Sequence, residues 1–282
     1  MSKLFEGCLL VSDIDGTLVS SDILHPDNVK MIKQFESDGG KFILASGRSA
    51  EALYVLEEHL GKLPVSIVCN GAVIYDFENK CALFEQPIVN VDKLYIKAAM
   101  ERFPNIAIAV HGDNIVYALI DGEILRENVE YEKLTCVFCG FEEAKDKQWY
   151  KVVFMLNDLK EADGLIKLGK EFGLESSYLE PSKCLMNGKV QNFMEVHPNG
   201  VSKANALQKF IQYNNLQNGK VFAIGDYFND VSMLKLADVS AAVKEAPDEV
   251  KACADYTAVG CKDGAVADFI GYLYSLKKKG CI

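Results

Sequence analysis

Near its start the chain reads Cys8-Leu9-Leu10-Val11-Ser12-Asp13-Ile14-Asp15-Gly16-Thr17, and this stretch decides the fold. An apolar run of strand length ends in two carboxylates that stand two residues apart. Side chains alternate along a strand, so Asp13 and Asp15 are expected to project toward the same side, and Gly16 lets the backbone turn without a steric penalty. Two close carboxylates raise the pKa of one of them unless a cation neutralises the pair. The pattern is typical of a carboxylate nucleophile beside an acid/base or of a magnesium site, and a plain turn is the alternative.

Two later apolar runs end in the same way. Residues 41–45 lead into Ser46-Gly47-Arg48, and residues 221–225 lead into Asp226-Tyr227-Phe228-Asn229-Asp230. Between them, Gly200-Val201-Ser202-Lys203 opens a predicted helix. In open parallel α/β sheets, ligands bind outside the carboxyl ends of the strands. Because the spacing between these segments is long and irregular, only a folded sheet could assemble them into one site.

These four segments resemble the four motifs of the haloacid dehalogenase (HAD) superfamily of phosphohydrolases, in the expected order. Asn70-Gly71-Ala72, after the apolar run at residues 65–69, and Asp263-Gly264-Ala265-Val266-Ala267 further resemble the Cof-type branch, which has a large type IIB cap. The resemblance covers nearly the whole chain, and the cap is its least constrained part. Each motif alone is a weak signal, but four in order at strand ends are a strong one.

The resemblance implies a role for each catalytic residue. Asp13 is the nucleophile that forms the aspartyl-phosphate, and its position at a strand end, where the backbone is most fixed, agrees with that role. Asp15 is the general acid that protonates the leaving group and then activates water. Lys203 opposes the dipole at the start of its helix and therefore needs a nearby anion. It is expected to steady Asp13 and the transferring phosphoryl group.

The resemblance also implies Mg²⁺ as the cofactor. Its direct ligands are Asp13, the backbone carbonyl of Asp15, and Asp226, and the ion lets this many carboxylates stay ionised together. Asp230 acts on the metal through water or orients Lys203. Helix capping by the residues of the same turn is a second interpretation, which does not exclude the first.

Six residues are predicted to bind the substrate phosphate. The hydroxyl of Ser46 donates to a phosphoryl oxygen, Gly47 allows close approach, and Arg48 grips the phosphate with two hydrogen bonds. Asn70 and Gly71 line the floor of the site. The alternatives are structural, namely a strand–helix turn, a helix cap or a surface arginine. The full set is Ser46, Gly47, Arg48, Asn70, Gly71 and Asn229.

The composition is that of an ordinary globular protein. Of its 282 residues, 49% are hydrophobic and 25% are charged. The formal net charge of −10 disfavours nucleic acid and anionic membranes as partners. The first apolar run is short and meets Asp13 at once, so neither a signal peptide nor a membrane span is expected. Nine cysteines, an odd number, indicate reduced thiols and a cytoplasmic protein. Cys136 and Cys139 have the spacing of a metal or redox pair, but two ordinary cysteines are the simpler interpretation.

The order of predicted elements indicates two domains. A doubly wound, parallel-sheet (Rossmann-like) α/β core is expected at residues 1–83 and 191–282, with a strand at 192–196. An inserted α+β cap domain is expected at 84–190. Within the core, one helix is predicted from Pro26 and another across residues 50–60. Four polar or aromatic cap residues are expected to pack rather than to face the substrate: His111, Tyr117, Trp149 and Tyr178.

We therefore interpret the chain as a Mg²⁺-dependent phosphatase of small phosphorylated metabolites, either sugar phosphates or related monoesters. The reaction would pass through phospho-Asp13, and the cap would close over the site and select the leaving group. Two alternatives stay open. One is a sugar phosphomutase, which would shield the aspartyl-phosphate from water, and the other is a catalytically silent regulator that binds a phosphorylated metabolite. No obligate protein partner is evident, and the sequence does not name the substrate.

Overall fold

The structure is a computed structural model that describes residues 3–20, 23–174, 179–186 and 189–282. The chain divides into two compact units. The core unit comprises Met1–Gly47, Val55–Phe84 and Ser202–Ile282, and the inserted unit comprises Arg48–Tyr54 and Glu85–Val201.

These limits differ from the predicted cap at 84–190, because residues 48–54 and 191–201 group with the insertion. Tyr178, one of the four cap residues expected to pack, lies outside the described residues.

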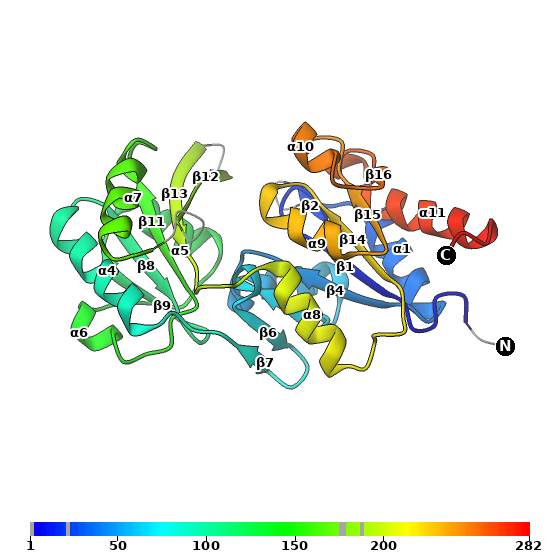
Figure 1. The fold of residues 1–282 in the computed structure, drawn as a ribbon, viewed down its shortest axis with the longest axis horizontal. Coiled ribbons are helices and arrows are strands. Elements are labelled where there is room, and N and C mark those ends of the chain that lie inside the picture. Colours follow the sequence, from blue (N-terminus) through cyan, green and yellow to red (C-terminus); the bar gives the residue numbers. More distant parts are fainter. Residues whose placement is uncertain (1–2, 21–22, 175–178, 187–188) are drawn as a thin grey trace. The chain divides into compact units, whose positions relative to one another are not determined.

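The core unit is built on a sheet of eight described strands (Figure 1), which are β1 (Leu9–Ser12), β4 (Lys41–Ala45), β5 (Ser66–Val68), β6 (Val73–Asp76), β7 (Cys81–Glu85), β14 (Val221–Gly225), β15 (Val239–Ala242) and β16 (Tyr256–Thr257). Their order across the sheet is β16-β15-β14-β1-β4-β5-β6-β7. Pairing is parallel from β16 to β5 and antiparallel between β5 and β6. This mixed α/β architecture on a parallel sheet confirms the predicted fold class, and it places β1 between two strands from distant parts of the chain.

Helices cover this sheet, namely α1 (Pro26–Ser37), α3 (Glu57–Leu60), α8 (Lys203–Tyr213), α9 (Val231–Leu236), α10 (Asp248–Lys251) and α11 (Ala265–Lys278). A small hairpin of β2 (Val19–Ser20) and β3 (Ile23–Leu24) follows the first loop. Helices α1 and α11 pack together, and the buried side chain of Asn28 links them. Its Nδ2 donates to the carbonyl of Leu18 (3.2 Å), and its Oδ1 accepts from the amide of Ala267 (2.9 Å).

The two helix predictions had different outcomes. Helix α1 begins at Pro26, as predicted, with proline in its first turn, where the missing N–H costs nothing. The single helix expected at 50–60 is wrong. The chain there forms α2 (Ala50–Leu53), the 3-10 turn η1 (Tyr54–Leu56) and α3. The break has a packing cause, because Ala52 packs in a cluster of the inserted unit whereas the chain from Val55 onward belongs to the core unit.

The inserted unit has its own sheet of six described strands, which are β8 (Ala107–His111), β9 (Val116–Ile120), β10 (Cys136–Phe138), β11 (Lys151–Leu156), β12 (Leu179–Met186) and β13 (Lys189–Val196). The order is β10-β9-β8-β11-β13-β12. The predicted return of the core at residues 192–196 is wrong, because β13 pairs antiparallel with β11 and β12 in this second sheet. A short apolar run carries no mark of the sheet that it joins.

Helices pack on this second sheet, namely α4 (Asn90–Arg102), α5 (Glu123–Tyr131), α6 (Phe141–Ala144) and α7 (Glu161–Glu171). Tyr95 of α4, Leu165 of α7 and Phe154 of β11 belong to one buried cluster. Leu125 of α5 belongs to another, with Phe193 of β13. The two clusters take alternate residues of the strands, as expected for opposite faces of one sheet.

Two of the four cap residues expected to pack, Trp149 and Tyr117, are packed in the structure. Trp149 is fully buried, and its Nε1 donates to the carbonyl of Ala144 (2.8 Å). Tyr117 packs partly buried against the same cluster. Cys136 and Cys139 are both free, half-buried thiols. Across the described residues, every helix is too short or too polar to cross a membrane.

Candidate active site

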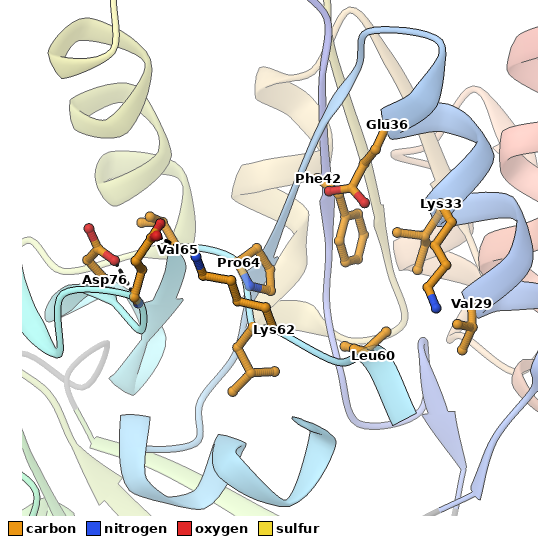
Figure 2. A pocket seen from close by; sticks show the side chains of 12 residues that line it. Val29, Lys33, Glu36, Phe42, Leu60, Lys62, Pro64, Val65 and Asp76 are labelled. Atoms are coloured by element: carbon orange, nitrogen blue, oxygen red, sulfur yellow. Dashed lines mark hydrogen bonds and ion pairs between the residues drawn. The ribbon is translucent and has the colours of Figure 1, made fainter. Parts of the chain in front are cut away.

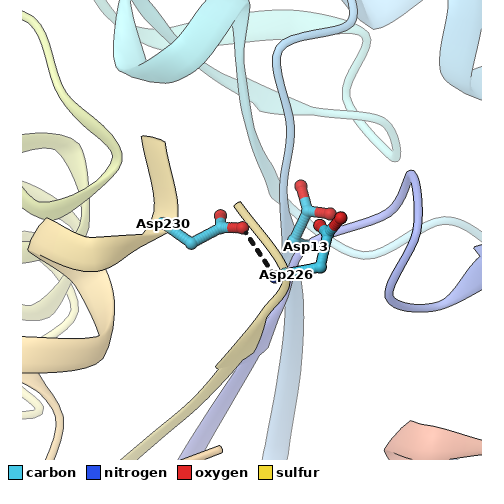
Figure 3. A group of neighbouring side chains, drawn as sticks. All are labelled: Asp13, Asp226 and Asp230. Atoms are coloured by element: carbon cyan, nitrogen blue, oxygen red, sulfur yellow. Dashed lines mark hydrogen bonds between the residues drawn. The ribbon is translucent and has the colours of Figure 1, made fainter. Parts of the chain in front are cut away.

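The carboxylates that follow β1 and β14 meet at the carboxyl ends of these two strands (Figure 3). The strands pair in parallel as far as Ser12 and Ile224, and the amide of Asp13 donates to the carbonyl of Ile224 (3.0 Å). Asp13 and Asp226 therefore leave neighbouring strands side by side. Together with Asp230 they form an acidic group in which one oxygen from each carboxylate lies within 4.8 Å of the others.

Lys203 supplies the positive charge of this group. Ser202 caps the start of α8, where its Oγ accepts from the amide of Asn205 (3.1 Å), and Lys203 is the first helical residue. The lysine is fully buried, and its Nζ lies 2.6 Å from Oδ1 of Asp13 and 2.6 Å from Oδ1 of Asp230. Burial alone would lower the pKa of Lys203, but the two carboxylates outweigh burial and raise it. The ammonium is therefore charged at neutral pH.

Asp230 is held by the protein through both carboxylate oxygens. Its Oδ1 binds Lys203, and its Oδ2 accepts from the amides of Asp226 (3.0 Å) and Tyr227 (3.1 Å). The residue lies in the 3-10 turn η4 (Phe228–Asp230). It thus closes the turn after β14 and, at the same time, orients the lysine.

The remaining carboxylates carry more negative charge than the protein offsets. Asp13 is only 5% exposed, and its Oδ2 is buried with no hydrogen-bond partner among the described residues. Burial, and next the neighbouring carboxylates, raise the pKa of Asp13 despite the ammonium of Lys203. The same two causes, burial first, raise the pKa of Asp226 to about 6. An orphaned oxygen and three carboxylates around one ammonium fit a hard divalent cation such as Mg²⁺.

The first loop is shaped to receive Asp226. Gly16 has φ +85°, and a Cβ built on it would lie 2.4 Å from Oδ2 of Asp226, so no other residue fits there without displacing that carboxylate. The hydroxyl of the fully buried Thr17 donates to Oδ1 of Asp226 (3.2 Å). Sequence reasoning gave Thr17 no role. A hydroxyl directly after the Asp-x-Asp-Gly run was the only signal for it.

Five of the six predicted phosphate-binding residues lie together in the core unit. Ser46, 1% exposed, follows β4, and its carbonyl accepts from the amide of Asn70 (3.0 Å). A Cβ on Gly47 would lie 3.2 Å from Oδ1 of Asn70. That same oxygen accepts from Nδ2 of Asn229 (3.1 Å). Gly71, the fifth, lies beside Asn70 in the 3-10 turn η2 (Cys69–Gly71).

Asp15 lies outside the group of three clustered acids. Strand β1 ends at Ser12, so the alternation of a strand does not extend to the carboxylates, and Asp15 is exposed whereas Asp13 is buried. Asp15 is not one of the three clustered acids, although its charge contributes to the raised pKa of Asp13. Arg48 is half-buried and groups with the inserted unit.

A cavity of about 400 Å³ in the core unit lies elsewhere (Figure 2). Phe42 near the start of β4, Val65 just before β5 and Asp76 at the end of the antiparallel strand β6 all line it. These positions are at the amino ends of the parallel strands. Ion-paired Lys62 and Glu78 (2.5 Å) stand at its rim. The cavity is therefore at the amino ends of the strands, whereas the acidic group is at their carboxyl ends. None of the predicted site residues lines the cavity.

Comparison with known proteins identifies a family. A family model described as haloacid dehalogenase-like hydrolase matches residues 10–270. A pyridoxal phosphate phosphatase of Escherichia coli is 24% identical over 273 residues, which cover 93% of this chain and 97% of the relative. A 5-amino-6-(5-phospho-D-ribitylamino)uracil phosphatase of Bacillus subtilis is 27% identical over 259 residues, with 91% and 92% covered.

Solved structures share the fold. A haloacid dehalogenase-like hydrolase from Bacteroides thetaiotaomicron superposes with a TM-score of 0.77 at 22% identity, covering 94% of this chain and 98% of that one. A HAD subclass IIB sugar phosphatase superposes with a TM-score of 0.76 at 20% identity, covering 97% and 99%. The similarity extends over both units, including the insertion.

Proposed function

This chain belongs to the haloacid dehalogenase-like hydrolases as a phosphoric monoester hydrolase, and we propose that it uses Mg²⁺ and a phosphoryl intermediate on Asp13. The observation that carries the proposal is the buried ammonium of Lys203, 2.6 Å from both Asp13 and Asp230. A fixed positive charge beside a carboxylate nucleophile can offset the charge of an approaching phosphoryl group. A structural ion pair alone would need neither the third carboxylate, Asp226, nor an orphaned oxygen on Asp13.

In the first step a carboxylate oxygen of Asp13 attacks phosphorus, and the bond between phosphorus and the ester oxygen breaks. Asp15 gives its proton to that ester oxygen, so the leaving group departs as an alcohol. Lys203 stays protonated and holds Asp13 in place. The phosphoryl oxygens are assigned to the predicted phosphate-binding set: Ser46, Gly47, Arg48, Asn70, Gly71 and Asn229.

In the second step Asp15, now a carboxylate, takes a proton from a water molecule. The oxygen of that water attacks phosphorus, the bond to Asp13 breaks, and inorganic phosphate leaves. Both aspartates are then back in their starting states. The exposure of Asp15 suits this role, because the group must meet both the leaving alcohol and water.

The proposed metal ligands follow from the excess negative charge of the acidic group. Asp13, the backbone carbonyl of Asp15, and Asp226 would hold Mg²⁺, which when bound supplies positive charge to the phosphoryl oxygens. Asp230 is assigned to orienting Lys203 rather than to direct ligation, because protein donors engage both of its oxygens.

We assign the substrate to small phosphorylated metabolites, namely sugar phosphates or related monoesters. Two curated relatives carry the names of phosphatases of pyridoxal phosphate and of a phosphoribitylamino-uracil, both small phosphate monoesters. The inserted unit is proposed to select the leaving group.

The test is phosphate release from a panel of sugar, nucleotide and cofactor phosphates, with Mg²⁺ and with EDTA. We expect Mg²⁺-dependent turnover that Asp13→Asn abolishes and that Asp15→Asn lowers by about 10²- to 10⁴-fold. Asp238→Asn, which changes an aspartate paired with Lys220 outside the site, is the matched control and should leave turnover unchanged.

Near-full activity of Asp13→Asn would refute the phosphoryl intermediate. Positional isomers of a sugar phosphate without phosphate release would instead identify a phosphomutase. Tight binding without turnover of any ester would identify the silent regulator.

A further inference from the structure

The turn after β5 has an unusual backbone. Cys69, Asn70 and Gly71 have consecutive positive φ angles of +49°, +54° and +108°. This region is unfavourable for residues that carry a Cβ, and here two such residues in a row adopt it. Both are nearly buried, with Cys69 2% and Asn70 8% exposed. Strained backbone of this kind persists only where the surroundings determine it, and it clusters at functional sites.

The turn touches the loop after β4. The amide of Asn70 donates to the carbonyl of Ser46 (3.0 Å). The side chain of Asn70 lies against Gly47, where an added Cβ would come within 3.2 Å of its Oδ1. The positive φ of Asn70 thus places both its amide and its side chain on the residues proposed to hold the phosphoryl group.

The turn also touches the start of α8. A Cβ on Gly71 would lie 2.3 Å from the carbonyl oxygen of Ser202, a distance that no real Cβ shows. Ser202 is the cap residue directly before Lys203. Only a glycine lets the two segments approach this closely, so the turn sets where the helix that carries the lysine begins.

A third contact reaches the loop after β14. Oδ1 of Asn70 accepts from Nδ2 of Asn229 (3.1 Å), a residue 159 positions away and adjacent to Asp230. One three-residue turn therefore contacts every catalytic segment except the first. Lys203 donates to both Asp230 and Asp13, so a shift of the turn is expected to move Asp13 as well.

We propose that the Cys69–Gly71 turn is a positioning element for phosphoryl transfer, and that Asn70 is its positioning residue. The inference rests on the proposed function. It assigns to Oδ1 of Asn70 the task of setting the distance between the Ser46-Gly47 loop and the Asn229-Asp230 loop. In-line transfer depends on that distance, because small misplacements of the reacting groups are costly in rate.

A double-mutant cycle on kcat tests this. Asn70→Gly keeps the positive φ without its steric cost and removes the amide, while Asn229→Ala removes the donor alone. We expect each to lower kcat by roughly 10- to 100-fold, with a smaller rise in KM from the lost phosphate contact, and the double variant to lose no more kcat than either single one. Lys80→Gly is the matched control. It also has positive φ (+52°), but in an exposed turn, and should leave kcat unchanged.

Each other outcome overturns the inference. If the two fold-losses in kcat multiplied in the double variant, the side chains of Asn70 and Asn229 would act independently. A rise in KM with kcat retained would limit Asn70 to binding the substrate phosphate and would exclude a positioning role. Full activity of Asn70→Gly would leave it no role. These results require an active wild type, so failure of the proposed function is seen separately, as wild-type protein that releases no phosphate.

Discussion

Lys203 is the side chain on which the acidic group depends most. It is fully buried between Asp13 and Asp230. Removal of one partner from a buried ion pair leaves charge without compensation, at a cost of about 3–5 kcal/mol. We therefore expect Lys203→Met to lower the free energy of unfolding by about that amount in metal-free buffer, measured by urea denaturation.

Lys220→Met provides the control for this prediction. Lys220 is half exposed and pairs with Asp238 at 2.8 Å, so its loss should hardly change the denaturation midpoint. If Lys203→Met unfolded at the same urea concentration as the wild type, the carboxylates around it would have to be neutral, and the assigned charge of the group would be wrong.

Single residues also mark the limit of sequence reasoning. Asp226 and Lys203 were predicted from strand-end and helix-start patterns, and the structure brings them into one group. The hydroxyl of Thr17 and the orphaned Oδ2 of Asp13 were not predicted. The residue type shows which hydrogen bonds a side chain can make. The partner of Thr17 is 209 positions away, however, so the folded structure is needed to identify it.

Among the elements, the second sheet carries a polar group across its strands. His111 at the end of β8 is opposite Lys151 on β11 and is 3% exposed, with its Nδ1 buried and unpartnered within the described chain. Lys151 pairs with Glu195 of β13 (3.2 Å), which His197 also contacts (3.0 Å). Burial first, and then the charge of Lys151, lower the pKa of His111 to about 3.

This shift predicts a pH dependence with a definite sign. Between pH 3 and 6.5 the unfolded chain binds a proton at His111 that the folded chain does not. Its contribution to stability is complete above pH 6.5 and is lost as the pH falls, by up to about 1.4 kcal/mol per pH unit. Glu195, whose pKa is lowered because Lys151 and His197 outweigh its burial, loses its contribution only at more acidic pH.

The measurement is urea denaturation of the whole protein from pH 4.5 to 7, with unfolding of the inserted unit monitored by tryptophan fluorescence. The single tryptophan of the chain, Trp149, is buried in this unit and reports its unfolding. We expect His111→Leu to flatten the pH dependence and the exposed control His59→Leu to preserve it. An unchanged slope in His111→Leu would mean that another group titrates.

Elements differed in how well they could be predicted. Helix α1 was predicted because proline and the apolar spacing are local signals. The helix at 50–60 and the sheet membership of residues 192–196 were wrong, since both depend on which unit the segment packs against. That choice is made by contacts with distant residues, and a short segment carries no record of them.

In the whole molecule, metal binding should appear as stability. A ligand that binds only the folded state stabilises it by about 2.7 kcal/mol at a concentration 100 times its Kd. For a unit of this size that corresponds to a rise in Tm of roughly 5–10 °C. We expect Mg²⁺ to raise the Tm of the core unit in this way, measured by circular dichroism, and EDTA to reverse the rise.

Two variants decide whether the effect belongs to the acidic group. Asp226→Asn should abolish the Mg²⁺-induced rise in Tm, whereas Asp238→Asn, outside the site, should retain it. A rise that survives in Asp226→Asn would place the metal elsewhere in the chain.

The sequence by itself determined the fold class, the family and the chemical groups of the site. Apolar runs, strand-end carboxylates and a capped lysine are properties of a few neighbouring residues, so they can be recognised without the fold. Only the tertiary structure decided which of those groups are hydrogen-bonded to one another and which strands pair. Both carboxylate oxygens of Asp230 accept hydrogen bonds from the protein. Asn70 hydrogen-bonds to Asn229 in another loop, and β13 belongs to the second sheet. The physical reason is that each of these depends on the pairing of segments far apart in the chain, which is settled by the packing of the whole core and not by local preference.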